Sequence, residues 1–229
     1  LCLTLLPTAA FAAEGSEEPV QEENGISVQS SEPHTHYLCG ATGESHNCSS
    51  TWDAKHEFQK WDSNNSLPVE GPASYYLTQD VELTKTWEPY ADITLCPNGH
   101  TITMKGDKSV ISSSGTFTLV DCKGGKKEYG QITHASGSKG HGVELTGGTF
   151  NMYGGNITGN DASTLTGYGL SSSGGGVYMT GKSTFNLYGG QITKNTAHSG
   201  GGVYSDHDSN SKCTFNMYDG EISDNTATM

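Results

Sequence analysis

Histidine and cysteine side chains crowd together between residues 33 and 57, and both types bind metal ions well. The candidate ligands are His34, His36, Cys39, His46 and Cys48. Thiolate sulfur and imidazole nitrogen suit Zn²⁺, and structural zinc sites usually take four such ligands. A metal bound there would staple a small module rather than catalyse a reaction. Residues 33–57 are therefore a predicted His/Cys-rich module with a candidate structural zinc.

The cysteines also allow disulfides, and spacing alone does not choose between the two chemistries. Within residues 33–57, a Cys39–Cys48 disulfide with solvated histidines is the alternative to zinc, and a third outcome is neither. Cys96 and Cys122 form a second candidate disulfide, because they lie about one sequence repeat apart. The alternative for that pair is two buried thiols.

Residues that could catalyse a reaction form no complete set in the sequence. It contains no GxSxG, HExxH or Walker-type motif, and every basic residue is a lysine. The densest acidic group surrounds His207 and comprises Asp206, Asp208, Asp219 and Glu221. We interpret it as a solvated loop and outer face, with a weak Ca²⁺ site as the functional alternative. The sequence thus leans away from an enzyme and assigns no catalytic residue.

An internal repeat must position these residues. Three segments, 149–160, 184–195 and 214–225, align without gaps around a Thr-Phe-Asn-Met/Leu-Tyr pattern. Each segment follows a glycine-rich piece. Apolar and polar residues alternate with period two, as in strands with one buried face. Glycine pairs between the pieces allow sharp corners. Three short strands in about thirty residues predict one coil of a parallel β-helix.

Stacked coils place equivalent residues about 4.8 Å apart, so the repeats predict ladders of identical side chains. We expect buried ladders of valine (143, 177, 203), phenylalanine (117, 150, 185, 215) and isoleucine (132, 157, 192, 222). Asparagines 160, 195 and 225 are expected to bond between layers at a turn. Outward tyrosine rings are candidates for binding sugars or a protein, with ladder packing as the alternative: Tyr153, Tyr188, Tyr218, Tyr178 and Tyr204.

Composition and the N-terminal segments indicate where the protein works. The 229-residue chain has a net charge of −13, which argues against nucleic acid and anionic membranes as partners. Residues 1–13 read as a partial Sec-type signal peptide, which predicts an extracellular or cell-surface location. Residues 14–32 read as an acidic disordered linker. No segment is apolar enough for membrane insertion.

The repeat as a whole resembles those of a known group of proteins. The Gly-Gly-Gly-Val-Tyr and Thr-Phe-Asn-Leu-Tyr-Gly-Gly pieces resemble the right-handed parallel β-helix (pectin-lyase-like) repeats of secreted and surface proteins of gut Firmicutes. Residues 34–40 resemble their HxHCxCG element, although Tyr37 stands where its first cysteine is expected. The resemblance implies an all-β, right-handed parallel β-helix over residues 58–229, truncated at its C-terminal end.

The same resemblance directs the search for function. Pectate-lyase-like sites combine Ca²⁺-binding carboxylates with arginine or lysine, and this chain lacks arginine. Gly140-His141-Gly142 resembles one piece of a polygalacturonase-like site, but it aligns with the ordinary glycine corner of later repeats. We therefore expect a non-catalytic adhesion or display module that binds a polysaccharide, a mucin glycan or a host surface protein. The alternatives are a polysaccharide lyase or glycoside hydrolase with its active site in further coils, and a structural spacer.

Overall fold

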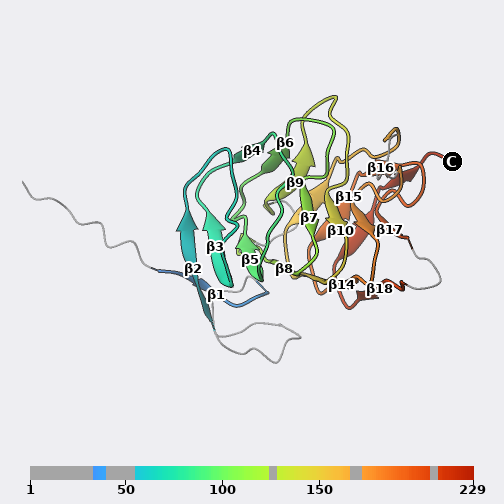
Figure 1. Cartoon of the computed structure of the whole chain (residues 1–229). Helices are drawn as coiled ribbons and strands as arrows, with labels where there is room; N and C mark the ends of the chain where they lie inside the picture. The colour runs from blue at the N-terminus through green and yellow to red at the C-terminus, as the bar shows by residue number, and fades with distance from the viewer. Residues whose placement is uncertain (1–32, 40–54, 124–127, 166–171, 207–210) are drawn as a thin grey trace, which may run out of the picture. The chain divides into compact units, whose positions relative to one another are not determined.

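The computed structural model describes residues 33–39, 55–123, 128–165, 172–206 and 211–229, all within one compact unit, Pro33–Met229. Every regular element of these residues is a strand, so the predicted all-β class is confirmed (Figure 1). The predicted signal peptide (residues 1–13) and the predicted acidic linker (residues 14–32) lie outside the described residues. Apart from one antiparallel pair, the described strands pair in parallel across four sheets.

The strands of the four sheets are as follows. The eight-stranded sheet contains, in order, β1 (His34–His36), β2 (His56–Trp61), β3 (Ala73–Leu77), β5 (Ile93–Cys96), β8 (Thr116–Leu119), β11 (Thr149–Met152), β14 (Thr184–Leu187) and β18 (Thr214–Met217). The six-stranded sheet contains β4 (Val81–Leu83), β6 (Ile102–Met104), β9 (Gln131–His134), β12 (Asn156–Thr158), β15 (Gln191–Thr193) and β19 (Glu221–Ser223). The smaller sheets contain β7 (Ile111–Ser113), β10 (Val143–Leu145), β13 (Val177–Met179) and β17 (Val203–Ser205), and the pair β16 (Thr196–Ala197) and β20 (Thr226–Ala227).

Each sequence repeat adds one strand to each of the three larger sheets, in register with the repeat before it. Phe150 pairs with Phe185, Ile157 with Ile192 and Val143 with Val177. The predicted in-register ladders are confirmed, but in the last repeat Val203 and Ile222 are half-buried and Phe215 is exposed. The other predicted ladder residues are buried. Their side chains fill one continuous apolar core, and in β11 the buried Phe150 and Met152 alternate with the half-buried Thr149 and Asn151. We call one such repeat a coil.

A row of three asparagines follows β12, β15 and β19, the strands of the six-stranded sheet from the last three repeats. Asn160 Nδ2 donates to Asn195 Oδ1 at 2.9 Å, and Asn195 Nδ2 donates to Asn225 Oδ1 at 3.0 Å. Each of these oxygens also accepts from the backbone N–H of the preceding asparagine in the row. At the start of the row, Asn160 Oδ1 lies 2.7 Å from Nδ1 of the buried His134. The predicted bonding between layers is confirmed.

Candidate metal centre

The strand β1 brings two histidines against the first coils. It pairs antiparallel with β2, which in turn pairs in parallel with β3. Because side chains two apart on a strand share a face, His34 and His36 lie on the same side of β1. The His34 ring stacks on Tyr76 with centroids 4.0 Å apart, and the His36 ring stacks on Phe58 at 4.2 Å. These aromatic contacts fix both imidazoles.

Two cysteines from neighbouring coils meet at the same place. Leu95 belongs to the main core, so the next residue, Cys96, points to the other face of its strand β5, where it joins a second, smaller apolar cluster. Cys122 follows β8 in the next coil and contacts that cluster. The two Sγ atoms lie 3.6 Å apart, and Cys122 Sγ lies 3.5 Å from His34 Nε2. One ligand atom from each of His34, His36, Cys96 and Cys122 lies within 4.8 Å of the others.

His36 has the orientation of a metal ligand. Its Nδ1 bonds the backbone carbonyl oxygen of Tyr37 at 2.6 Å, which makes Nδ1 the protonated nitrogen. Its Nε2 is buried and has no hydrogen-bond partner in the described structure. Burial lowers the pKa of His36, so its neutral form is favoured. Metal-binding histidines are commonly held in this way, with one N–H on a carbonyl and the other nitrogen's lone pair free for the ion.

The two cysteines differ in acidity although they are neighbours. The hydrogen bond from the Cys96 thiol is the main cause that lowers the pKa of Cys122 to about 4, and the adjacent His34 and His36 act in the same direction. Burial raises the pKa of Cys96 well above its ordinary value. The two opposite shifts favour a single proton held between the two sulfurs, and a cation would draw that proton off because thiolates are the ligand form.

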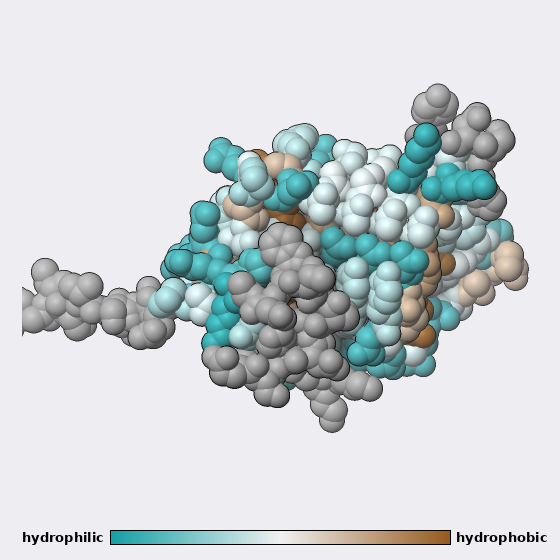
Figure 2. All heavy atoms as spheres, turned by 90° about the horizontal axis from the view of Figure 1, so that it is seen from below, coloured by the Kyte–Doolittle hydropathy of each residue, from teal (hydrophilic) through white to brown (hydrophobic). Residues whose placement is uncertain are grey.

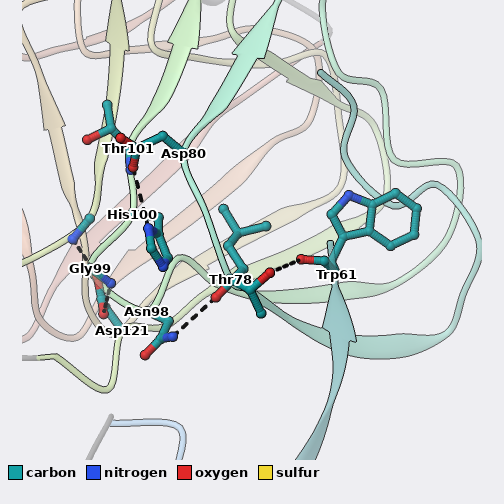
Figure 3. Close-up of polar contacts among 10 residues, drawn as sticks. Trp61, Thr78, Asp80, Asn98, Gly99, His100, Thr101 and Asp121 are labelled. Atoms are coloured by element: carbon teal, nitrogen blue, oxygen red, sulfur yellow. Dashed lines mark hydrogen bonds and ion pairs between the residues drawn. The ribbon is translucent and has the colours of Figure 1, made fainter. Parts of the chain in front are cut away.

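A shell of backbone hydrogen bonds holds the segments that carry the cysteines. Asp121, next to Cys122, is buried; its carboxylate accepts from the N–H groups of Gly99 at 3.2 Å, Lys123 at 3.0 Å and Gly130 at 2.6 Å. Burial raises the pKa of Asp121, and these N–H groups oppose that rise. Figure 3 shows Asp121 reaching Gly99 in the turn just after Cys96.

The turn after Cys96 is also tied to the preceding coil. Asn98 has a positive φ of 55° and donates from Nδ2 to the carbonyl oxygen of Leu77 at 3.1 Å. The Thr101 N–H donates to Asp80 Oδ1 at 2.8 Å, and the His100 ring lies beside the same carboxylate (Figure 3). The Cys96 backbone is thus positioned by contacts on both sides of its coil.

The arrangement can hold a metal ion. With Zn–S bonds of about 2.3 Å and Zn–N bonds of about 2.0–2.1 Å, tetrahedral geometry places ligand atoms about 3.3–3.8 Å apart. The 3.6 Å separation of the sulfurs and the 3.5 Å separation between Cys122 and His34 fall in that range. The 4.8 Å limit on the whole group requires the remaining ligand atoms to close by only about 1 Å.

The metal-binding cluster of the structure contains only part of the ligand set predicted within residues 33–57. It places His34 and His36 in the cluster, whereas Cys39 is disulfide-bonded and therefore offers no thiolate. His46 and Cys48 lie outside the described residues. Cys96 and Cys122 are free thiols rather than a disulfide, and they supply the sulfurs. Sequence spacing missed this combination because the histidines and cysteines meet only after β1 has paired with β2. Among the described residues, the acidic candidates for Ca²⁺ are not gathered in such a cluster.

The candidate tyrosines lie in stacked rows. The rings of Tyr153 and Tyr188 stack at 4.6 Å, and those of Tyr188 and Tyr218 stack at 4.7 Å. Their faces are thus turned mainly to one another, and ring edges face outward. Tyr178 is buried, and its hydroxyl donates to Asp206 at 2.9 Å, while its ring lies 6.2 Å from that of Tyr204. This geometry agrees with the ladder-packing alternative.

The fold and the cluster together define an all-β protein of parallel, in-register sheets with a two-histidine, two-cysteine group able to hold a metal ion. Comparisons with protein-family models, with curated proteins and with solved structures found no match for this chain. No helix of the described residues has the length and apolarity needed to cross a membrane.

Proposed function

We propose that this chain is an extracellular or cell-surface display module, folded as a right-handed parallel β-helix and clasped at its first coils by a structural zinc ion. The four-ligand cluster carries the zinc part of the proposal, above all the buried, unpartnered Nε2 of His36 facing two cysteines. His34, His36, Cys96 and Cys122 would hold the ion. The ion would act as a structural cross-link that joins β1 to two successive coils.

A structural role fits the surroundings better than a catalytic one. The cluster lies against the apolar cluster of Phe58, Cys96 and Val120, and Cys96 and His36 are fully buried. Catalytic zinc sites keep a coordination position open to water and substrate, whereas structural sites are closed by four protein ligands. The repeated outer rows of the coils support the proposed display role, because they would offer a regular surface to a polysaccharide, a mucin glycan or a host protein.

Metal content tests the zinc part. The purified protein is expected to contain one zinc per chain by elemental analysis, and Co²⁺ in its place is expected to give the visible spectrum of a tetrahedral site with thiolate ligands. His36→Ala and Cys96→Ser should lose the metal, and chelation should lower the melting temperature of the unsubstituted protein. Cys213→Ser is the matched control, because Cys213 is a free cysteine outside the cluster. A folded protein without metal, or with metal retained in both cluster variants, would contradict the assignment.

Binding without turnover tests the display part. The chain is expected to bind at least one of a panel of immobilised polysaccharides, mucin and host surface proteins, in a saturable manner. No new reducing ends or unsaturated uronates should appear in solution. Turnover by the purified chain would replace the display role with that of a lyase or hydrolase. Neither binding nor turnover would contradict the display role and favour a structural spacer.

A further inference from the structure

A cavity beside the first coils is lined by none of the residues of the cysteine cluster. It has a volume of about 530 Å³, within the range of small-ligand pockets. Leu67, Leu83 and Trp87 line it and are each only 4% exposed. The indole N–H of Trp87 donates to the Pro68 carbonyl oxygen at 2.7 Å, which fixes the ring. The cavity therefore has a preformed apolar floor.

An exposed apolar rim adjoins this floor. Tyr90 and Val69 both line the cavity, with 80% and 42% of their surfaces exposed. On the face seen in Figure 2, the described surface is mostly teal or white, with brown confined to a few patches. In contrast to Tyr153 and Tyr188, Tyr90 stacks on no ring of the described residues, and most of its side chain is exposed. An uncovered tyrosine beside an aliphatic side chain is a platform on which the C–H face of a sugar ring can pack.

The charge of the cavity is opposite to that of the chain. Lys85 and Lys108 line it, and neither forms an ion pair with a described residue. Other lysines in this acidic chain do so, as Lys105 does with Glu82. Glu88 is the one acidic residue of the lining, so the cavity carries a net positive charge at neutral pH. Asn65, Thr84 and Thr86 add hydrogen-bonding groups suited to sugar hydroxyls.

We infer that this cavity binds a sugar that carries an anionic group. The ring would pack on Tyr90 and Val69, and the anion would be held between Lys85 and Lys108. An acidic peptide is less well matched, because the lining combines an open aromatic face with several neutral hydroxyl and amide groups. The inference names a ligand class for the proposed display function and rests on that part of it, but it needs no zinc.

Titration with defined oligosaccharides tests the inference on the complete chain. The probes are sialyllactose, an oligogalacturonate and a sulfated heparin oligosaccharide, with lactose and cellohexaose as neutral controls. We expect saturable binding of at least one anionic probe, weakened when salt is raised from about 0.02 to 0.5 M, and none of the neutral controls. The probe that binds identifies the anionic group that is recognised: the terminal carboxylate of sialyllactose, the uronate of the oligogalacturonate or the sulfate of the heparin oligosaccharide.

Matched variants connect the binding to the cavity. Tyr90→Ala and the double variant Lys85→Gln/Lys108→Gln should each weaken binding by about tenfold or more. Lys182→Gln changes an exposed lysine outside the cavity and should have no effect. Equal binding of neutral probes, absence of binding by every anionic probe, or unchanged binding in the double variant would each overturn the inference. If mucin or polysaccharide binding survives Tyr90→Ala, the display function stands and only this site is wrong.

Discussion

Replacing Phe150 with alanine is expected to lower the free energy of unfolding by about 3–5 kcal/mol. The ring is fully buried and lies between those of Phe117 at 5.1 Å and Phe185 at 4.8 Å. Its removal loses the transfer free energy of the ring and leaves a cavity that two neighbouring coils cannot fill without leaving their register. Urea unfolding followed by circular dichroism measures the change.

Phe215→Ala is the matched control for this substitution. Phe215 occupies the same repeat position and stacks on Phe185 at 5.1 Å, but it is 39% exposed in this chain. Because water already reaches the ring, its loss should cost less than about 2 kcal/mol. Equal losses for the two variants would contradict the expectation that burial sets the cost of removing a phenylalanine ring.

Replacing Asn195 with alanine is expected to cost about 3 kcal/mol, although the side chain is polar. Asn195 is fully buried; its Nδ2 donates to the Ile157 carbonyl at 2.9 Å and to Asn225, and its Oδ1 accepts from Asn160. Deletion of the amide leaves several buried groups without partners, and each unsatisfied group costs about 1–3 kcal/mol, with sums that are not additive.

Asn186→Ala separates this effect from the loss of any stacked asparagine. Asn186 also bonds its equivalents in the adjacent coils, with Nδ2 2.9 Å from Asn151 Oδ1, but it is only half-buried. Water can replace the lost partners there, so we expect a cost below about 1 kcal/mol in the same urea assay. A cost for Asn186→Ala that matches the cost for Asn195→Ala would contradict the role assigned to burial.

The repetitive part of the fold could be predicted because its information is local. Alternation in Thr149–Met152 identifies the buried face, and identical residues in later repeats give the register directly. The orientation of the tyrosine rings was less accessible: period two places Tyr153 and Tyr188 outward, but only the side-chain torsions decide whether their faces meet solvent or each other.

The metal centre could be predicted only in part. His34 and His36 were identified from their residue type and close spacing. Their sulfur partners, Cys96 and Cys122, lie in two different coils and approach the histidines through the pairing of β1 with β2. That pairing depends on packing of His36 on Phe58 and His34 on Tyr76, which no fixed sequence interval encodes.

The buried asparagine row has a consequence for how such a chain can change in length. Asn195 accepts a hydrogen bond from Asn160 in the coil before it and donates one to Asn225 in the coil after it, so its coil uses the same amide chemistry on both sides. A coil duplicated or deleted between Asn160 and Asn225 would leave this chemistry intact. The boundary at His134 is different, because there an imidazole faces Asn160 Oδ1. Coils can therefore be exchanged on the C-terminal side of Asn160, where asparagine meets asparagine, but not across its contact with His134.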